Sequence, residues 1–240
     1  MRIIIIIACI LTIAAIGIDL YTWSNVLKPT DTDLDTWIIW SRYIRFARTA
    51  VFSFVFIAYL QSGHFTKDHT LMLLAMLVAT IADFYLILQN KLIIGIGIFA
   101  IMQLLLLYRH LQGFSWQLFQ QKIYLYLTIG LFVFAAGILY FLYAPLQAKG
   151  LFWPVAGYGF LLIISVLAAA YSKASGVLSP LQANLALSGM VLFLICDITV
   201  GLGAVWSDQP AGYLVRALTG VVYTPALIFL SLSTYKRFQR

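Results

Sequence analysis

Two aspartates lie inside long apolar stretches of the sequence: Asp83 in LVATIADFYLIL and Asp197 in VLFLICDITVGL. An ionisable residue at the centre of a membrane helix costs about 2.5–3.5 kcal/mol on insertion scales, so it usually faces the bundle interior and has a partner. Burial favours the neutral form of an unpaired carboxylate, which can then donate a proton. Both aspartates are therefore candidates for proton-transfer chemistry, with ion pairs that hold a bundle together as the plainer role.

Three arginines are the candidate partners. Arg42, Arg45 and Arg48 are spaced by three, so they share one face of a helix. Arg48 lies about 16 Å past Trp37 at the helical rise per residue, too deep to reach the membrane surface easily. A guanidinium fork donates two hydrogen bonds at once to carboxylate or phosphate. For Arg45 and Arg48, a structural ion pair and the binding of a substrate phosphate are equally favoured.

The composition predicts the elements that position these residues. Of 240 residues, 63% are hydrophobic and only 10% are charged, and all eight acidic residues are aspartate. An ordinary soluble domain has about 25% charged residues. The apolar runs are continuous, whereas strands of an outer-membrane barrel alternate apolar and polar residues. The sequence therefore predicts an all-α, polytopic transmembrane helical bundle.

Eight apolar segments can be recognised, and each is long enough to cross a bilayer. No linker or change of composition divides the chain, so we expect a single integral membrane domain over residues 1–240. The first segment is also compatible with a signal peptide, but its length and the spans that follow favour a true span. The predicted segments are 3–23, 37–60, 71–89, 92–110, 122–144, 152–171, 184–206 and 213–235.

The basic residues of the loops predict the orientation. Eight of them fall on the side that includes both termini, which the positive-inside rule assigns to the cytoplasm. Arg42, Arg45 and Arg48 enter from the other side and bring the two counts close to each other. The +7 net charge is scattered over span ends, so we do not expect a nucleic-acid partner. The eight are Arg2, Lys67, Arg109, Lys122, Lys173, Lys236, Arg237 and Arg240.

This orientation predicts a common depth for the polar residues. At the helical rise per residue, Asp83 lies about 9 Å and Asp197 about 13 Å from the outer ends of their spans. Arg48, Gln103 and Tyr223 lie at about 15–17 Å from the same side. The five residues are therefore predicted to form one polar layer in the non-cytoplasmic half. A plain hydrogen bond between helices is the simpler role for Gln103 and Tyr223.

Other chemistries are less well supported by the sequence. His64, His69 and His110 all lie at span ends, away from the two aspartates, so neither a three-ligand zinc site nor a Ser-His-Asp triad is expected. Asp31, Asp33 and Asp35 alternate as at the start of a calcium loop, but the closing Glu is missing. Cys9 and Cys196 are interpreted as free, buried thiols. We therefore predict no metal and no cofactor.

The chain resembles the YhhN-like lysoplasmalogenases, small polytopic membrane proteins of bacteria and animals. The family's third span carries Gly-Asp before aromatic and aliphatic residues, and here the corresponding positions are Ala82 to Leu86. Its seventh span carries a Gly-Ala-x-x-Phe-x-x-Ser-Asp pattern, whose Gly, Phe and Asp have counterparts in SGMVLFLICD. The matching residues are Asp83, Gly189, Phe193 and Asp197, with Pro154 and Tyr158 in the sixth span and Tyr223 in the last.

The sequence departs from the family pattern at several of these places. Ala82 stands where the family usually has Gly, Cys196 where it usually has Ser, and Gln103 about where a His is common. Tyr223 is followed by Thr-Pro, without the usual Gln soon after it. These departures bear on activity more than on fold.

The resemblance implies hydrolysis of the vinyl ether bond of a lysophospholipid, which gives a fatty aldehyde and a glycerophospho-base. Asp83 and Asp197 would be the catalytic residues, and Arg45, Arg48, Gln103, Tyr158 and Tyr223 would bind the substrate. The implied setting is the bilayer, with a bacterial inner membrane as the expected location. Two alternatives are a small-molecule or proton-coupled transporter, since intramembrane aspartates also relay protons, and a non-catalytic protein of the same fold.

Overall fold

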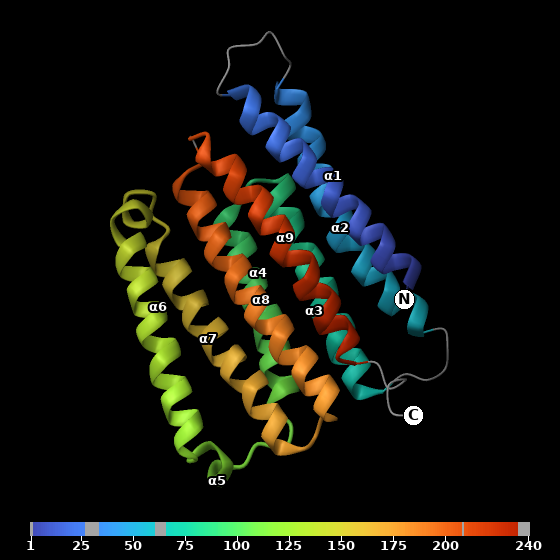
Figure 1. The fold of residues 1–240 in the computed structure, drawn as a ribbon, viewed down its shortest axis with the longest axis vertical. Coiled ribbons are helices and arrows are strands. Elements are labelled where there is room, and N and C mark those ends of the chain that lie inside the picture. Colours follow the sequence, from blue (N-terminus) through green and yellow to red (C-terminus); the bar gives the residue numbers. More distant parts are fainter. Residues whose placement is uncertain (1, 27–33, 61–65, 208, 235–240) are drawn as a thin grey trace.

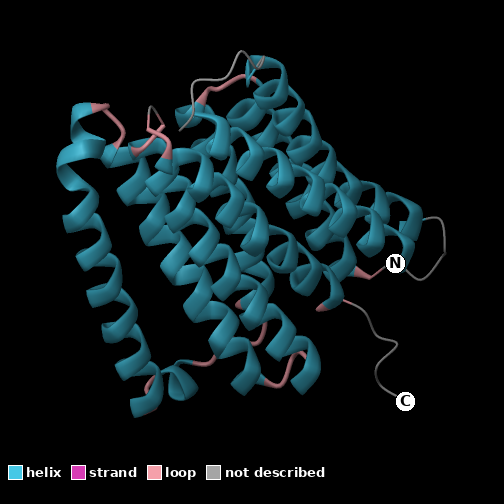
Figure 2. Cartoon of the chain, turned by 45° about the horizontal axis from the view of Figure 1, so that its top comes forward, coloured by secondary structure: helices cyan, strands magenta, loops and turns pink. Residues whose placement is uncertain are grey.

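In a computed structural model, the chain is a bundle of long helices joined by short loops (Figure 2). The structure describes residues 2–26, 34–60, 66–207 and 209–234. Asp31, Asp33 and His64, considered above, lie outside these residues. No strand occurs in the described part of the chain, which confirms the all-α prediction.

Eight long helices correspond to the eight predicted segments, and most ends agree within four residues. The exceptions are two: the third segment changes to a π-helix after Asp83, and the short α5 was not predicted. Pro145 does not end its helix, which continues to Ala148. The elements are α1 (Arg2–Val26), α2 (Leu34–Leu60), α3 (Lys67–Asp83), η1 (Phe84–Leu88), α4 (Leu92–His110), α5 (Trp116–Phe119), α6 (Lys122–Ala148), α7 (Phe152–Ser175), α8 (Pro180–Val205) and α9 (Ala211–Leu232).

Seven described helices are long and apolar enough to cross a membrane, which supports an integral membrane protein. The remaining long helix, α2, carries Arg42, Arg45 and Arg48. It packs between α1 and α3 along with the other spans. Composition alone therefore does not identify α2 as a span, although its length and position match the others.

The long helices form a closed ring with one helix outside it. Around the ring the contacts run α1, α2, α3, α4, α7, α8, α9 and back to α1. The excluded helix, α6, packs mainly on α7, and Figure 1 shows it at the edge of the molecule. Most of the α6 surface is exposed, as expected for a helix that faces lipid on most sides.

The closest packing is between α8 and α9, where a small residue is required. A Cβ atom added at Gly189 would lie 2.8 Å from Cγ and 3.0 Å from the backbone nitrogen of Leu230. Small residues at such positions let membrane helices approach closely, because lipid provides no hydrophobic drive for their association. Gly189 is thus a packing residue that allows α8 and α9 to lie close together at Leu230.

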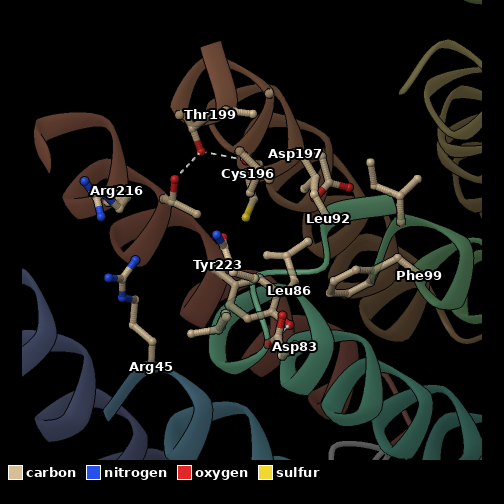
Figure 3. Close-up of a pocket in the computed structure, with 18 of the residues that line it drawn as sticks. Arg45, Asp83, Leu86, Leu92, Phe99, Cys196, Asp197, Thr199, Arg216 and Tyr223 are labelled. Atoms are coloured by element: carbon tan, nitrogen blue, oxygen red, sulfur yellow. Dashed lines mark hydrogen bonds between the residues drawn. The ribbon is translucent and has the colours of Figure 1, made fainter. Parts of the chain in front are cut away.

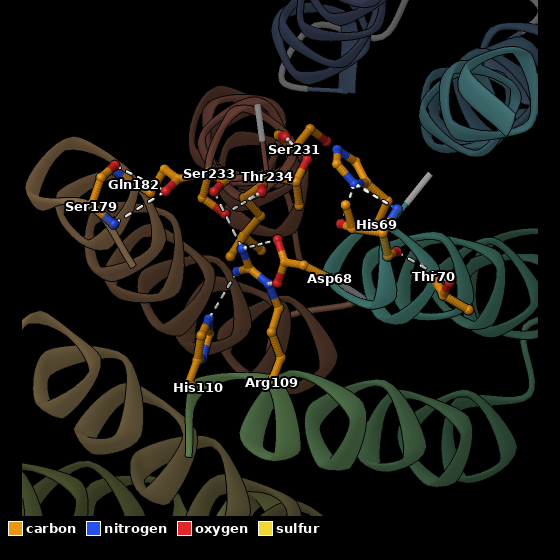
Figure 4. Close-up of polar contacts among 12 residues, drawn as sticks. Asp68, His69, Thr70, Arg109, His110, Ser179, Gln182, Ser231, Ser233 and Thr234 are labelled. Atoms are coloured by element: carbon orange, nitrogen blue, oxygen red, sulfur yellow. Dashed lines mark hydrogen bonds and ion pairs between the residues drawn. The ribbon is translucent and has the colours of Figure 1, made fainter. Parts of the chain in front are cut away.

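A polar cluster joins three helices at one end of the bundle (Figure 4). Arg109 of α4 donates to both carboxylate oxygens of Asp68 in α3, from Nε at 2.6 Å and from Nη2 at 3.1 Å. Nη2 also donates to the carbonyl of Ser233, just after α9. His110 is buried beside the Arg109 guanidinium. This cluster holds together the N-terminal end of α3 and the C-terminal ends of α4 and α9.

Candidate functional site

A cavity of about 470 Å³ lies within the helix ring, at the end opposite the Asp68–Arg109 cluster. Its polar lining combines the two intramembrane aspartates with four arginines, Arg42, Arg45, Arg48 and Arg216. Most lining residues come from the end of α3, from η1, from the C-terminal half of α8, and from the N-terminal halves of α2, α4, α7 and α9; Arg48 and Tyr223 lie close to the middle of their helices. All of these ends fall on the side that the sequence predicts to be non-cytoplasmic.

Asp83 is deeply buried, with 3% of its surface exposed. Its Oδ2 accepts hydrogen bonds from the Thr49 hydroxyl at 2.6 Å and from the Tyr223 hydroxyl at 2.9 Å. Asp83 is also the last residue of α3 before η1, and single π-turns inside helices are frequently found at functional sites. Gly95 of α4 packs against Leu86 of η1 here, where an added Cβ would lie 3.0 Å from the Leu86 Cβ.

Asp197 differs from Asp83, because it is only partly buried. Its Oδ2 accepts a hydrogen bond of 2.5 Å from the Tyr158 hydroxyl of α7. Gln103 of α4 is completely buried, and its side-chain nitrogen and oxygen have no hydrogen-bond partner among the described residues. Each aspartate therefore has a tyrosine partner of its own, and the two pairs sit on different pairs of helices.

Arg45 is engaged by a carboxylate that the sequence did not indicate as its partner. Its Nη2 lies 3.5 Å from Oδ1 of Asp19, a buried residue of α1. Ser41 bridges the pair, since its hydroxyl donates to Asp19 at 2.8 Å and accepts from Arg45 at 2.9 Å. An ion pair and the binding of a phosphate were equally favoured for Arg45. The contacts show the ion pair, and the residue also lines the cavity.

Arg48 is the most deeply buried arginine of the cavity, with 2% of its surface exposed. Its guanidinium carbon lies 4.9 Å from the centre of the Tyr223 ring, a cation–π arrangement. Among the described residues, its Nε and Nη1 have no hydrogen-bond partner. Buried donors of this kind are normally satisfied, so Arg48 is an exception within the cavity wall.

Arg216 is a site residue that the sequence did not single out. It projects from the first turns of α9, stacks over Tyr213 at 4.2 Å, and lines the cavity. Figure 3 shows its guanidinium beside that of Arg45, on the side of the view away from Asp83 and Asp197. Arg45 and Arg216 thus make one side of the cavity positive, whereas Arg48 packs against Tyr223, the partner of Asp83.

Four of the five residues of the predicted polar layer line one cavity: Asp83, Asp197, Arg48 and Tyr223. Gln103, the fifth, is buried and does not line the cavity. Arg45 and Tyr158, which were predicted as substrate-binding residues outside that layer, also line it. Thr49 and Asp19 were not predicted as site residues. Thr49 directly follows Arg48, and Asp19 is an acidic residue inside the first apolar segment, so both positions could have suggested a polar role.

The histidines lie where the sequence placed them, as far as they are described. His69 and His110 belong to the Asp68–Arg109 end of the bundle, at the opposite ends of α3 and α4 from the two aspartates. Within the described ranges, no group of three or more His, Cys, Asp or Glu side chains is placed to hold a metal ion. Cys196 is a free, buried thiol that lines the cavity next to Asp197. Cys9 is also free but only partly buried, so the prediction of its burial was wrong.

Comparison with known proteins connects this arrangement to a family. Neither curated proteins nor solved structures gave a match. The family profile described as the YhhN family matches residues 43–234. That range includes Arg45, Arg48, Asp83, Asp197 and Tyr223, and omits α1 with Asp19. Because the match covers most of the sequence, the chain belongs to the YhhN family.

Proposed function

We propose that the protein hydrolyses the vinyl ether bond of lysoplasmalogen-type lysophospholipids, giving a fatty aldehyde and a glycerophospho-base. The observation that carries this proposal is the single cavity in which two intramembrane carboxylates face four arginines. A lysoplasmalogen has one anionic phosphate and one acid-labile vinyl ether bond. Its binding site therefore needs arginines for the phosphate and carboxyl groups for the bond, separated by less than the length of the molecule.

The proposed chemistry uses the two aspartates in complementary roles. A protonated carboxyl delivers its proton to the β-carbon of the vinyl ether. The lone pair of the ether oxygen is shared with the neighbouring carbon, so the product of this step is an oxocarbenium ion. Water adds to that ion and gives up one proton to the carboxylate that donated in the first step, which yields a neutral hemiacetal and restores the acid. The hemiacetal then breaks to aldehyde and alcohol. An ionised second carboxylate stabilises the positive charge as it develops. Asp83 and Asp197 form the proposed pair, much as two carboxyl groups divide acid and anion roles in glycosidases.

The arginines have different parts in this proposal. Arg48 lines the cavity and two of its buried nitrogens have no hydrogen-bond partner among the described residues, and Arg216 lines the cavity from α9, so these two are the proposed phosphate ligands. Arg45 is largely neutralised by Asp19 and adds less net charge. Phosphate is bound well by guanidinium groups because the fork donates two parallel hydrogen bonds.

The carrier hypothesis receives less support from the packing. Beyond Asp83, α3 presents Met72, Met76 and Ala79 to the interior, and each is at most 1% exposed. These residues belong to the main apolar core, together with side chains of α4, α7, α8 and α9. A reaction chamber closed at one end is compatible with such a core, whereas transport requires a path through it.

The test is product formation by the purified full-length protein. Matched alkenyl and acyl lysophospholipids are supplied in detergent micelles, and both aldehyde and fatty acid are assayed. We expect aldehyde from the alkenyl lipid, with a loss of about 10²–10⁴ in rate on Asp83→Asn and on Asp197→Asn. Asp35→Asn is the matched control, because Asp35 is exposed at the start of α2 and does not line the cavity.

The outcomes separate the hypotheses. Fatty acid release in place of aldehyde would retain hydrolysis and reject the vinyl ether bond as the target. No product from either lipid would reject the proposal and favour a transporter or a non-catalytic role. Full aldehyde release by both Asp83→Asn and Asp197→Asn would reject the carboxylate mechanism.

A further inference from the structure

A second, apolar cavity adjoins the polar one. It has a volume of about 80 Å³ and lies between α6, α7 and α8. Nearly all of its lining is hydrocarbon, as in Phe134, Ala135 and Ile138 of α6, Gly159 and Leu162 of α7, and Leu194 of α8. We call this space the apolar slot. The polar cavity and the apolar slot have four residues in common: Val155, Tyr158, Asp197 and Gly201.

The Tyr158–Asp197 pair therefore marks the boundary between two chemically different spaces. On one side is the chamber with four arginines, and on the other is a narrow space that offers almost only carbon. The partial exposure of Asp197 contrasts with the burial of Asp83 and agrees with its position at this boundary. A ligand that satisfies both spaces is amphiphilic, with an anionic head and one hydrocarbon chain.

The position of α6 gives the slot a route to the bilayer. The helix lies outside the ring, and Phe134 at the edge of the slot is 50% exposed on the lipid-facing surface. A Cβ atom added at Gly159 meets no other atom within 4 Å, so the backbone of α7 leaves open space there. An alkyl chain can lie in this space and continue into the surrounding lipid without crossing the packed core.

We infer that the apolar slot holds the hydrocarbon chain of a single-chain phospholipid whose phosphate lies in the arginine-lined cavity. This inference deepens the proposed function and rests on it for the identity of the lipid. It places the bond between head and chain next to Asp197, while Asp83 lies deeper in the polar chamber. The slot is shaped by side chains of three helices, so these set which chain is accepted.

The test is photolabelling with a lipid that cannot be turned over. The probe is a saturated alkyl-ether lysophospholipid that carries a diazirine in its chain, added to the purified full-length protein. After irradiation, labelled peptides are mapped by mass spectrometry. We expect labels within residues 134–142, 159–163 and 194–201. Labelling should fall when a phosphate-free alkyl glycerol of the same chain replaces the probe.

Matched variants test the slot itself. Gly159→Phe fills it and should reduce labelling several-fold, whereas Gly157→Phe, two residues away on the exposed face of α7, should leave labelling unchanged. Ala135→Phe fills the slot from α6, with the neighbouring exposed Ala136→Phe as its control. Two blocking positions on separate helices keep the test decisive if one variant does not fold, which thermal melting reports.

The result can fail independently of the proposed function. Equal labelling of the blocked variants and their controls, or equal labelling by the alkyl glycerol, would overturn the inference, since the slot would then not select this lipid. Labels confined to the exposed faces of α6 would overturn it as well. Labelling of the slot without aldehyde release from the alkenyl substrate would keep the chain site and reject the reaction, because the probe reports binding alone.

Discussion

The two tyrosine–aspartate pairs predict different losses when their hydroxyls are removed. Tyr158→Phe deletes the 2.5 Å hydrogen bond to Asp197, and the described residues provide no second side-chain bond to that carboxylate. Tyr223→Phe deletes the 2.9 Å bond to Asp83, but the 2.6 Å bond from Thr49 to the same oxygen remains. Both changes keep the aromatic ring, so the surrounding packing is preserved. The comparison isolates what one donor contributes to each carboxylate.

The magnitude follows from the type of bond. A hydrogen bond to a charged group contributes about 1.5–3 kcal/mol. If that stabilisation is lost from the transition state, Tyr158→Phe lowers kcat by about 10- to 150-fold, at 1.36 kcal/mol for each factor of ten. For Tyr223→Phe we expect only about a 3- to 10-fold loss, because Thr49 still donates to the oxygen. The expectation for Tyr158 holds whether Asp197 gives the proton or stabilises the cation, since its negative charge needs the donor in both roles.

The assay is aldehyde release from an alkenyl lysophospholipid over a range of substrate concentrations, so that kcat and KM are obtained separately. Thermal melting in the same detergent shows whether each variant is folded. A kcat for Tyr158→Phe within about twofold of the parent value would refute the reasoning, because the bond would then make no difference to the transition state. A larger loss for Tyr223→Phe than for Tyr158→Phe would reverse the assigned importance of the two pairs.

Three further outcomes are expected at other parts of the molecule. Arg216→Gln should raise KM about tenfold for phosphate-bearing lysolipids and leave kcat nearly unchanged, because one charged contact is lost; an equal effect on an alkenyl glycerol without phosphate would contradict a phosphate role. Asp68→Asn should lower the melting temperature, since the Arg109 side chain is 1% exposed and a buried charge without its partner costs about 3 kcal/mol; unchanged melting would show that the pair is dispensable. Gly189→Val should also destabilise the fold, by about 1–3 kcal/mol, because its side chain would overlap Leu230, and Gly189→Ala should cost less; equal melting of both variants would rule out a steric cause.

Much of the architecture could be predicted from the sequence, because long apolar runs specify membrane helices directly. The ends of α4 were predicted to the residue, and the other spans to within a few residues. Depth along a helix is also accessible, since the rise per residue is fixed. This is why residue spacing alone could assign Asp83, Asp197, Arg48 and Tyr223 to one layer, and all four line the cavity.

Rotation about each helix axis was not accessible in the same way. Depth does not say which side chains face each other, so the partner of Arg45 was not identified as Asp19. Arg216 looked like an ordinary interfacial charge because it lies close to the start of its span. Gln103 has the predicted depth but does not line the cavity. The apolar slot exists because α6 packs outside the ring of helices. The pattern of apolar residues in the sequence does not show whether a helix packs inside or outside such a ring.

The π-turn that follows Asp83 gives the cavity an unusual sensitivity to chain length. A π-turn contains one more residue per hydrogen-bonded turn than an α-helix, in which each residue turns the chain by about 100°. Leu86 and Ile87 line the cavity from η1 itself, and Asn90 lines it from the connection to α4. Deleting a single residue between 84 and 88 is expected to turn these side chains away from the chamber, while leaving Asp83 in place. In this segment a deletion is expected to be more disruptive than most substitutions.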